Sequence, residues 1–438
     1  MSPVVQGLIV LVVTILVLTS GIPVAFGLGI VALGFLIAFH GLDSLQVVAE
    51  TFYASLDDFT LVSIPMFIMM GAAIGSSPAS KDLYEALDRW LYRLPGGLVI
   101  SNLGACAIFS ALSGSSPATC AAIGKMGIPE MRKRGYPKEI AAGSIAAGGT
   151  LGILIPPSIT FILYGIATET SIGRLFLAGV LPGLMLTGLF ILWTLYAMWR
   201  KGFRSHAPDF RYSWAEKLSG LPRVLPFILV VVGVIYALYG GIATPSEAAG
   251  VGAALCVVMA VVIYRMWRPA EWFRILRDTT RESVMILMII AASVLFGYML
   301  SSLYLTQTLA QTIADADVNR WVLMLFINLF LLVAGFFIPP AAVILMTAPI
   351  LLPIITAVGF DPVWFGVVLT INMEIGLITP PVGLNLYVIN GIAPDITLQQ
   401  ILRGSLPYML CMVAAIVILC VFPGIATWLP DVMMGPVR

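Results

Sequence analysis

The sequence predicts an all-α polytopic membrane protein with two inverted repeats, about ten transmembrane helices and two re-entrant helical hairpins. Hydrophobic residues make up 60% of its 438 residues and charged residues only 10%, whereas about a quarter of the residues in a soluble protein are charged. Many apolar stretches are long enough to span about 30 Å of hydrocarbon. Twice, at residues 151–157 and 375–381, an apolar helix runs into a glycine that is soon followed by a double proline.

These two double-proline motifs mark equivalent places in two homologous halves. Proline lacks a backbone N–H and clashes with the preceding turn, so each motif should break a membrane helix, and the freed backbone groups must find partners. Further matches keep nearly the same spacing: Pro23 with Pro245, Pro129 with Pro353, Gly135 with Gly359, Gly165 with Gly391, Gly179 with Gly404, and Pro182 with Pro407. A pair of broken helices in matching halves points to the binding site of a transporter.

The spans follow the same order in both halves. In the first half they are 4–20, 22–40, 60–77, an interrupted span at 138–168, and 175–199. The apolar segment 95–129 is split by a polar turn at 113–117 that cannot face lipid, so it is predicted to be a re-entrant hairpin. The second half has spans at 222–242, 245–265 and 282–302, a hairpin at 321–357, an interrupted span at 362–393 and a last span at 404–428. The amphipathic segments 43–58 and 268–281 are expected to be helices in the membrane interface, or else connecting loops.

Basic residues predict how the halves are oriented. Five crossings per half is an odd number, so the second half must be inverted relative to the first. Under this model all of the 23 basic residues except Arg174, Arg320 and Arg438 fall on the cytoplasmic side, as the positive-inside rule requires. Both termini are then periplasmic, and the two hairpins enter from opposite sides with their tips facing each other. The first stretch has no basic n-region or cleavage site and is interpreted as a retained helix.

Composition excludes several classes of function. The five cysteines stand singly in apolar segments, and the two histidines, His40 and His206, fall at predicted membrane edges, so no transition-metal site is expected. No cofactor is expected, and the net charge of +1 indicates no nucleic-acid partner. A nucleophile at Ser115 or Ser116 would need a base within hydrogen-bond reach, and the sequence offers none. An intramembrane serine hydrolase is therefore a remote alternative.

The first hairpin tip and the first helix break predict a cation site. Ser113, Gly114, Ser115 and Ser116 place three hydroxyl groups and a flexible backbone at the tip. The break at 152–157 leaves carbonyl groups without intrahelical donors, and such unwound carbonyls can coordinate sodium. The alternative is a polar helix cap and a proline kink that only pack together.

A mirror-related site is expected in the second half. Its tip, at 335–340, is nearly apolar, so backbone carbonyls would supply most ligands, with Thr379, Asn372 and Asn385 flanking the second break. Half-helix N-termini between the two breaks carry partial positive charge and suit a small anion. Glu374 is an ionisable residue at membrane depth, which makes it a functional candidate by default. It is a proton or cation partner, or it pairs with a basic or amide group.

Four motifs resemble those of the large permease subunit of TRAP transporters, the DctM type within the ion transporter superfamily. They are SGSSPAT at 113–119, IPEMRKRGY at 128–136, GGTLGILIPPS at 148–158 and GLITPPVGLNL at 376–386. The resemblance covers essentially the whole chain. It implies a sodium-coupled secondary transporter that imports a small organic acid (a carboxylate, dicarboxylate or sugar acid) across the bacterial inner membrane by an elevator mechanism. The implied partners are a small integral-membrane TRAP subunit on a separate polypeptide and a periplasmic substrate-binding protein. The alternatives within transport are a stand-alone sodium:carboxylate symporter and a passive channel.

The resemblance also divides the chain into fixed and moving parts. The first repeat, 1–200, has scaffold helices at 1–93 and 172–200 and a transport-domain hairpin and broken helix at 94–171. A cytoplasmic linker occupies 201–221. The second repeat, 222–438, has scaffold at 222–320 and 395–438 and a transport-domain hairpin and broken helix at 321–394.

The residues and the resemblance together give three groups of candidate site residues. The first sodium site comprises Ser113, Gly114, Ser115, Ser116, Gly152, Ile155 and Pro157. The second comprises Gly335, Phe337, Pro339, Gly376, Thr379 and Pro381. The substrate-binding candidates are Ser116, Thr150, Pro340, Asn372, Glu374 and Asn385. Similar sequences often carry an acidic residue in the second tip, where this chain has Pro339.

Overall fold

Every regular element that the structure describes is a helix, which confirms the predicted all-α fold. The computed structural model describes residues 3–91, 94, 96–200, 212–308, 311 and 318–435. Arg438, His206 and half of the predicted linker, 201–211, lie outside these ranges. Among the described residues, six helices are long and apolar enough to cross a membrane, or seven spans if one bent pair counts as a span. The protein is therefore built as a multi-pass membrane protein.

The first half runs from α1 to α10. Its elements are α1 (Pro3–Thr19), α2 (Val24–His40), η1 (Leu42–Leu45), α3 (Gln46–Leu56), η2 (Phe59–Val62), α4 (Ser63–Gly75), α5 (Ala79–Leu91), α6 (Gly97–Ser113), α7 (Ser116–Lys133), α8 (Lys138–Thr150), η3 (Leu151–Ile153), α9 (Ile159–Thr168) and α10 (Ile172–Arg200). Gly114 ends α6 in a left-handed conformation with φ of +57°, which glycine adopts without steric cost. The chain turns there, and Pro117 lies in the first turn of α7, where proline is tolerated.

The rest of the described chain runs from α11 to α21. Its elements are α11 (Trp214–Ser219), α12 (Leu221–Tyr239), α13 (Pro245–Val262), α14 (Pro269–Ser302), α16 (Arg320–Phe337), α17 (Pro340–Ala357), α18 (Pro362–Leu377), α19 (Leu384–Ile392), α20 (Leu398–Val421) and α21 (Gly424–Met434). Each predicted hairpin consists of two helices joined by a short turn, and each double proline interrupts a helix. The second break separates α18 from α19, as the first separates α8 from α9.

The halves differ at their amphipathic segments. Residues 268–281 were expected to form a separate helix, and this expectation is wrong, because they continue into the next span as α14. The 34 residues of α14 extend about 51 Å, well beyond about 30 Å of hydrocarbon. In the first half the equivalent pair, Leu42–Leu56 and Phe59–Gly75, is bent by 58°. The bend falls at Asp57 and Asp58, where the Asp58 carboxylate accepts a hydrogen bond from the Thr60 N–H at 2.8 Å.

The last predicted span also ends early. Helix α20 stops at Val421, and Pro423 precedes a separate helix, α21. Proline cannot continue the hydrogen-bond ladder of the helix before it. Residues 404–428 are therefore not one span.

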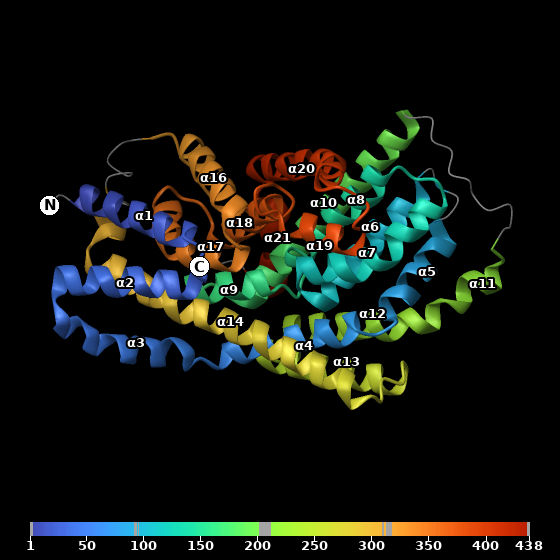
Figure 1. The fold of residues 1–438 in the computed structure, drawn as a ribbon, viewed down its shortest axis with the longest axis horizontal. Helices are drawn as coiled ribbons and strands as arrows, with labels where there is room; N and C mark the ends of the chain where they lie inside the picture. The colour runs from blue at the N-terminus through green and yellow to red at the C-terminus, as the bar shows by residue number, and fades with distance from the viewer. Residues whose placement is uncertain are drawn as a thin grey trace.

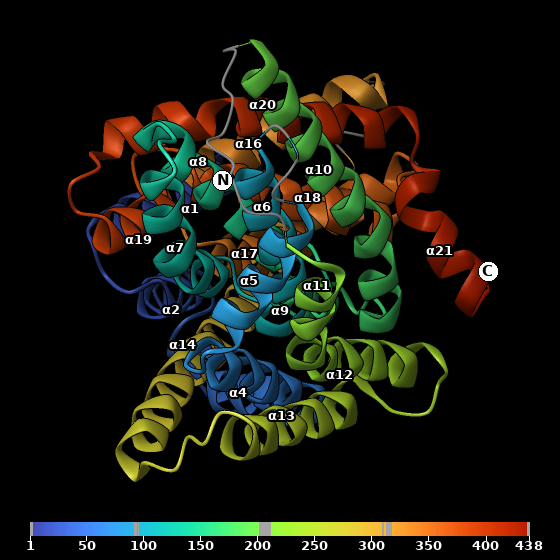
Figure 2. The same cartoon turned by 90° about the vertical axis from the view of Figure 1, so that its right-hand side faces the viewer.

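The helices form two layers, which Figures 1 and 2 both show. One layer contains α2, α4, α12, α13 and α14, which run roughly along the long axis of the molecule. The other contains the two hairpins, the two broken helices, α10 and α20. Helix α4 contacts α6, and α14 contacts α17, so the layers meet at the hairpin arms. This arrangement buries the first hairpin tip, where Ser113 and Ser116 are 2% and 0% exposed.

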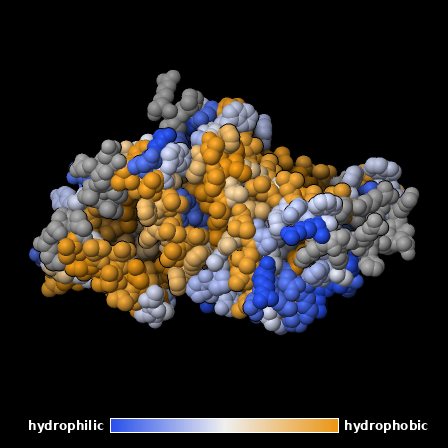
Figure 3. Space-filling model, turned by 90° about the horizontal axis from the view of Figure 1, so that it is seen from above, coloured by the Kyte–Doolittle hydropathy of each residue, from blue (hydrophilic) through white to orange (hydrophobic). Residues whose placement is uncertain are grey.

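Hydrophobic residues cover most of the surface visible in Figure 3. Hydrophilic residues gather near the right-hand end, where Figure 1 places α5 and α11. An apolar surface of this extent suits contact with lipid rather than water. The polar end corresponds to the side that the basic residues predict to be cytoplasmic.

Candidate functional site

The structure brings the first hairpin tip against the first helix break. A Cβ atom on Gly152 would stand 2.6 Å from the carbonyl oxygen of Ser115 and 2.9 Å from the backbone nitrogen of Ser116. A Cβ atom on Gly114 would stand 2.9 Å from the carbonyl oxygen of Pro157. Only glycine leaves room at these two points. Carbonyl oxygens of the tip and of the break therefore lie where the two segments meet.

Hydroxyl groups fix the carbonyl group of Ser115 at this contact. The Thr119 hydroxyl donates a hydrogen bond to the Ser115 carbonyl at 2.9 Å, and the Ser113 hydroxyl donates to it at 3.3 Å. The Ser113 and Thr119 hydroxyls lie 2.7 Å apart. Thr119 was not among the predicted site residues. It ends the motif at 113–119 and lies one turn into α7, and this position could have identified it.

The break itself is partly capped. The Ile155 N–H donates to the Leu151 carbonyl at 2.9 Å. The Ser158 hydroxyl donates to the Ile153 carbonyl at 2.5 Å and accepts from the Phe161 N–H at 3.3 Å, which caps α9. Pro157 is buried and Ile155 half-buried. The break is thus a fixed structure and not a loose loop.

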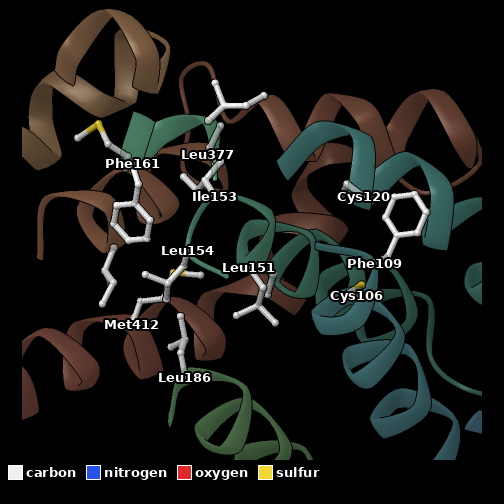
Figure 4. Close-up of a cluster of buried hydrophobic side chains, with 14 of the residues drawn as sticks. Cys106, Phe109, Cys120, Leu151, Ile153, Leu154, Phe161, Leu186, Leu377 and Met412 are labelled. Carbon is white, nitrogen blue, oxygen red and sulfur yellow. The ribbon is translucent and has the colours of Figure 1, made fainter. Parts of the chain in front are cut away.

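Apolar side chains on the far side of the break anchor it. Leu151, Ile153 and Leu154 point into a buried cluster to which Leu186 of α10 and Met412 of α20 also belong (Figure 4). Figure 4 also draws Ile153 close to Leu377 at the second break, and α18 contacts η3. The two breaks therefore share one core.

The second tip touches the second break in the same way. A Cβ atom on Gly376 would stand 2.5 Å from the carbonyl oxygen of Gly335. The Val382 N–H donates to the Phe336 carbonyl at 3.2 Å. The Thr379 hydroxyl donates to the Ile375 carbonyl at 2.6 Å, which occupies its proton within the helix end.

This second contact is more open than the first. Phe337 is 55% exposed, and Pro339 and Pro381 are also exposed, whereas Ser113 and Ser116 of the first tip are 2% and 0% exposed. The donors at the second contact are backbone carbonyls. The difference in polarity between the two tips is therefore matched by a difference in burial.

Ser116 and Asn385 join the two halves. The Asn385 amide donates to the Ser116 hydroxyl at 2.8 Å and to the Ala146 carbonyl at 3.0 Å. Ser116 is the first residue of α7, and Asn385 lies at the start of α19. Two helix N-termini therefore meet at this buried polar contact, and their free N–H groups favour an anion.

Asn372 and Glu374 lie on α18, apart from Ser116 and Asn385 along the sequence. The Asn372 amide donates to the side-chain oxygen of Asn328 on α16 and to the Val368 carbonyl. Asn328 was missed because a single amide in an apolar span carries no pattern. Glu374 is fully buried, and its carboxylate has no hydrogen-bond partner among the described residues. Among the described residues, neither the expected basic group nor the expected amide group pairs with Glu374.

The last two substrate candidates have ordinary local roles. The Thr150 hydroxyl donates to the Ala147 carbonyl at 2.7 Å, within α8. Pro340 begins α17 and is half-buried. Among the described residues no group of three or more His, Cys, Asp or Glu side chains could hold a metal ion. The oxygens at the first contact belong to carbonyl and hydroxyl groups and those at the second to backbone carbonyls, and oxygens of both kinds suit a hard cation such as sodium.

Comparison with known proteins identifies the family to which this architecture belongs. Residues 11–425 match the family model of the Tripartite ATP-independent periplasmic transporter, DctM component. The chain belongs to this family. A DctM component is a transporter permease and not an enzyme, so the tip serines have a structural or binding role.

Two relatives show how the DctM family varies. The chain is 37% identical to the C4-dicarboxylate TRAP transporter large permease protein DctM of Pseudomonas aeruginosa, over 89% of this chain and 90% of that protein. It is 35% identical to the isethionate TRAP transporter permease protein DctMQ of Oleidesulfovibrio alaskensis, over 94% of this chain and 64% of that longer protein. The fold is also that of the Alcanivorax borkumensis YdaH transporter, with a TM-score of 0.61, 17% identity and coverage of 92% and 91% of the two chains.

Proposed function

We propose that this DctM chain is the large membrane subunit of a sodium-coupled tripartite transporter that imports a small organic acid into a bacterium. The contact between the first tip and the first break carries the proposal. Gly152 leaves space for the Ser115 carbonyl, and the hydroxyls of Ser113 and Thr119 hold that carbonyl in place. These oxygens, with those of the break, form a suitable set of donors for sodium.

The substrate anion is proposed to bind where α7 and α19 begin. Ser116 and Asn385 already supply a hydroxyl and an amide there, and both helix N-termini favour negative charge. The names of the two relatives, for a C4-dicarboxylate and for isethionate, share the chemistry of a small organic anion. Sodium bound at the first contact, and at Gly335 and Gly376, would steady both hairpins around that anion.

Movement is proposed to follow an elevator mechanism, with the two hairpins and broken helices sliding past the other layer. Helix α20 contacts α8 backbone to backbone, since a Cβ atom on Gly404 would stand 1.8 Å from the Glu139 carbonyl oxygen and one on Gly143 only 2.1 Å from Gly404. Such close helix contact resists sliding. We therefore expect α20 to travel with α8, although residues 395–438 were assigned to the scaffold.

A small membrane subunit and a periplasmic binding protein are the proposed partners. The family description, tripartite and periplasmic, supports this, as does the DctMQ name of a relative that is longer than this chain. The transporter would lie in the inner membrane with both termini in the periplasm.

Sodium dependence tests the proposal. The ligand is first found by screening organic acids for those that raise the melting temperature of the binding protein. Proteoliposomes that hold this chain and the small subunit, with the binding protein outside, should take up that acid down a sodium gradient, and uptake should fall to background when potassium replaces sodium. Equal uptake in both salts would contradict sodium coupling. Uptake by this chain alone would instead favour a stand-alone symporter.

A further inference from the structure

A pocket of about 470 Å³ opens where α7 and α19 end. Ile128, Pro129 and Ile392 form its apolar wall, and Arg132, Lys133 and Asp395 bring charge to it. The pocket is outside the two tip contacts. Lys138, at the start of α8, reaches Asp395 from the next element.

The basic side chains around this pocket already hold a carboxylate. The Arg132 guanidinium lies 2.9 Å from one Asp395 carboxylate oxygen, and the Lys138 ammonium lies 3.1 Å from the same oxygen. A hydrogen bond from Lys138, together with the charge of Arg132, lowers the pKa of the Asp395 carboxyl from its ordinary value. Lys133 is directed to Glu130 at 3.7 Å. The cluster therefore binds a carboxylate group, which in this structure is that of Asp395.

This ion pair can open. Arg132, Lys138 and Asp395 have side chains that are 40%, 42% and 46% exposed, and ion pairs of such exposure are weak. An incoming carboxylate could therefore take the place of Asp395 without unfolding anything. The apolar wall would cover the carbon skeleton of a small organic acid.

The pocket lies directly beyond the proposed substrate contact. Helices α7 and α19 lie side by side in Figures 1 and 2, in mutual contact. Ser116 and Asn385 meet at their first turns. Along α19 the pocket is about 10 Å further on, at Ile392, and along α7 it is about 20 Å further on, at Pro129. Both helices therefore run from the proposed substrate contact to the pocket, towards the side that the basic residues predict to be cytoplasmic.

We propose that this pocket is a carboxylate-binding station at the cytoplasmic exit, and that Asp395 is the internal competitor that displaces the anion from it. The inference rests on the proposed import of an organic acid and on the predicted orientation. Arg132 and Lys138 attract the departing carboxylate, and the return of Asp395 releases it. The transported anion therefore does not stay bound at the exit after each transport cycle.

Removing the competitor tests this inference. The melting temperature of the purified chain in phosphatidylcholine nanodiscs is measured over a range of succinate concentrations. Sodium chloride of matched ionic strength serves as the reference at each concentration. A tethered group acts at an effective concentration of roughly millimolar, so Asp395→Asn should tighten succinate binding by about tenfold. The same variant with Arg132→Gln added should lose that gain. Asp431→Asn is the control, because it removes an equally exposed aspartate that pairs with an arginine, Arg174, outside the pocket, and it should show no gain.

The outcomes separate this inference from the proposed function. The gain in succinate affinity is measured by melting, without any transport, so it does not depend on uptake. Every variant also carries Asn385→Ala, so the gain does not depend on the proposed substrate contact. No gain in Asp395→Asn, or an equal gain in Asp431→Asn, would overturn the inference and leave sodium-driven uptake untouched. Stabilisation of Asp395→Asn by nanodiscs with phosphatidylglycerol, but not by succinate, would also overturn it, because the pocket would then take a lipid phosphate.

Discussion

Gly152 and Gly376 are each pressed against the backbone of a hairpin tip. A methyl group on Gly152 would stand 2.6 Å from the Ser115 carbonyl oxygen, and one on Gly376 would stand 2.5 Å from that of Gly335. Backbone atoms cannot give way as the end of a flexible side chain can. These two glycines therefore set the distance between each tip and its break, and with it the spacing of the oxygens proposed to bind sodium.

Gly152→Ala is expected to lower stability by about 1–3 kcal/mol, the usual effect of overpacking, and to reduce the rise in melting temperature caused by sodium. The displaced Ser115 carbonyl is the physical reason. Gly188→Ala is the control, since no atom lies within 4 Å of its added Cβ, and it should leave the sodium effect unchanged. Thermal unfolding of the purified chain at several sodium concentrations measures both. An undiminished sodium effect in Gly152→Ala would refute the site assignment.

Polar residues in unusual places were recognisable from the sequence, but their partners were not. Ser116 and Asn385 stood out beside a tip and a break, and the structure joins them. Asn328 lies in a uniformly apolar span, and only the packing of α16 on α18 shows that it faces Asn372. A single amide has no periodicity, so no pattern could have found this pair. The same holds for Ala146, which contributes only its carbonyl.

At the level of elements, α5 fastens the end of the first hairpin to the linker helix α11. Arg134, after α7, binds both carboxylate oxygens of Asp88 on α5 at 3.1 and 2.7 Å. Arg89, the next residue of α5, donates to the Glu216 carbonyl and to the Ser219 hydroxyl, each at 3.0 Å. The Asp88 and Arg134 side chains are only 6% and 18% exposed. This pair is largely buried, and breaking it leaves Arg134 with Glu130, 3.2 Å from its Nε atom, as its remaining acidic partner.

Asp88→Asn is expected to destabilise the protein by about 2 kcal/mol, because it weakens the charged hydrogen bonds of the largely buried Arg134, which keeps only Glu130 as an acidic partner. Glu85→Gln on the same helix is the control, since Glu85 makes exposed contacts with Lys81 and Arg89 at 3.8 Å and should cost no more than about 1 kcal/mol. Melting of both variants in matched nanodiscs measures the difference. Equal costs would show that the Asp88–Arg134 pair does not hold the hairpin.

Element types were predictable where proline and glycine punctuate the chain. The turn at Gly114 and the interruptions at both double prolines follow from backbone chemistry alone. The amphipathic segments were harder, because amphipathicity does not say whether a helix bends before the next span. Asp57 and Asp58 bend the first, whereas α14 carries no such interruption and runs straight through. Only the packing of the whole helix decides this.

At the level of the whole molecule, long-range contacts sort by predicted side. Segments predicted to be cytoplasmic contact one another, as Arg132 contacts Asp395 and Asp82 contacts Tyr264. Arg174, predicted to be periplasmic, contacts Asp431 beside the C-terminus. The positive-inside rule used none of these contacts. Their agreement with it supports the inverted arrangement, which the sequence proposes from the odd number of crossings per half and from charge.

Cysteine labelling of the two hairpins tests that inverted arrangement. Lys133 ends the second arm of the first hairpin and Thr356 lies near the end of the second arm of the other, and both are exposed. If the repeats are inverted, Thr356→Cys should react with a membrane-impermeant maleimide in intact cells stripped of their outer membrane, and Lys133→Cys only after lysis. The unmodified chain supplies the background, since Cys106, Cys120 and Cys256 are buried and the other two cysteines half-buried. Labelling of both positions from the same side would contradict the inversion, and it would also remove the reason to place the Asp395 pocket at the cytoplasmic exit.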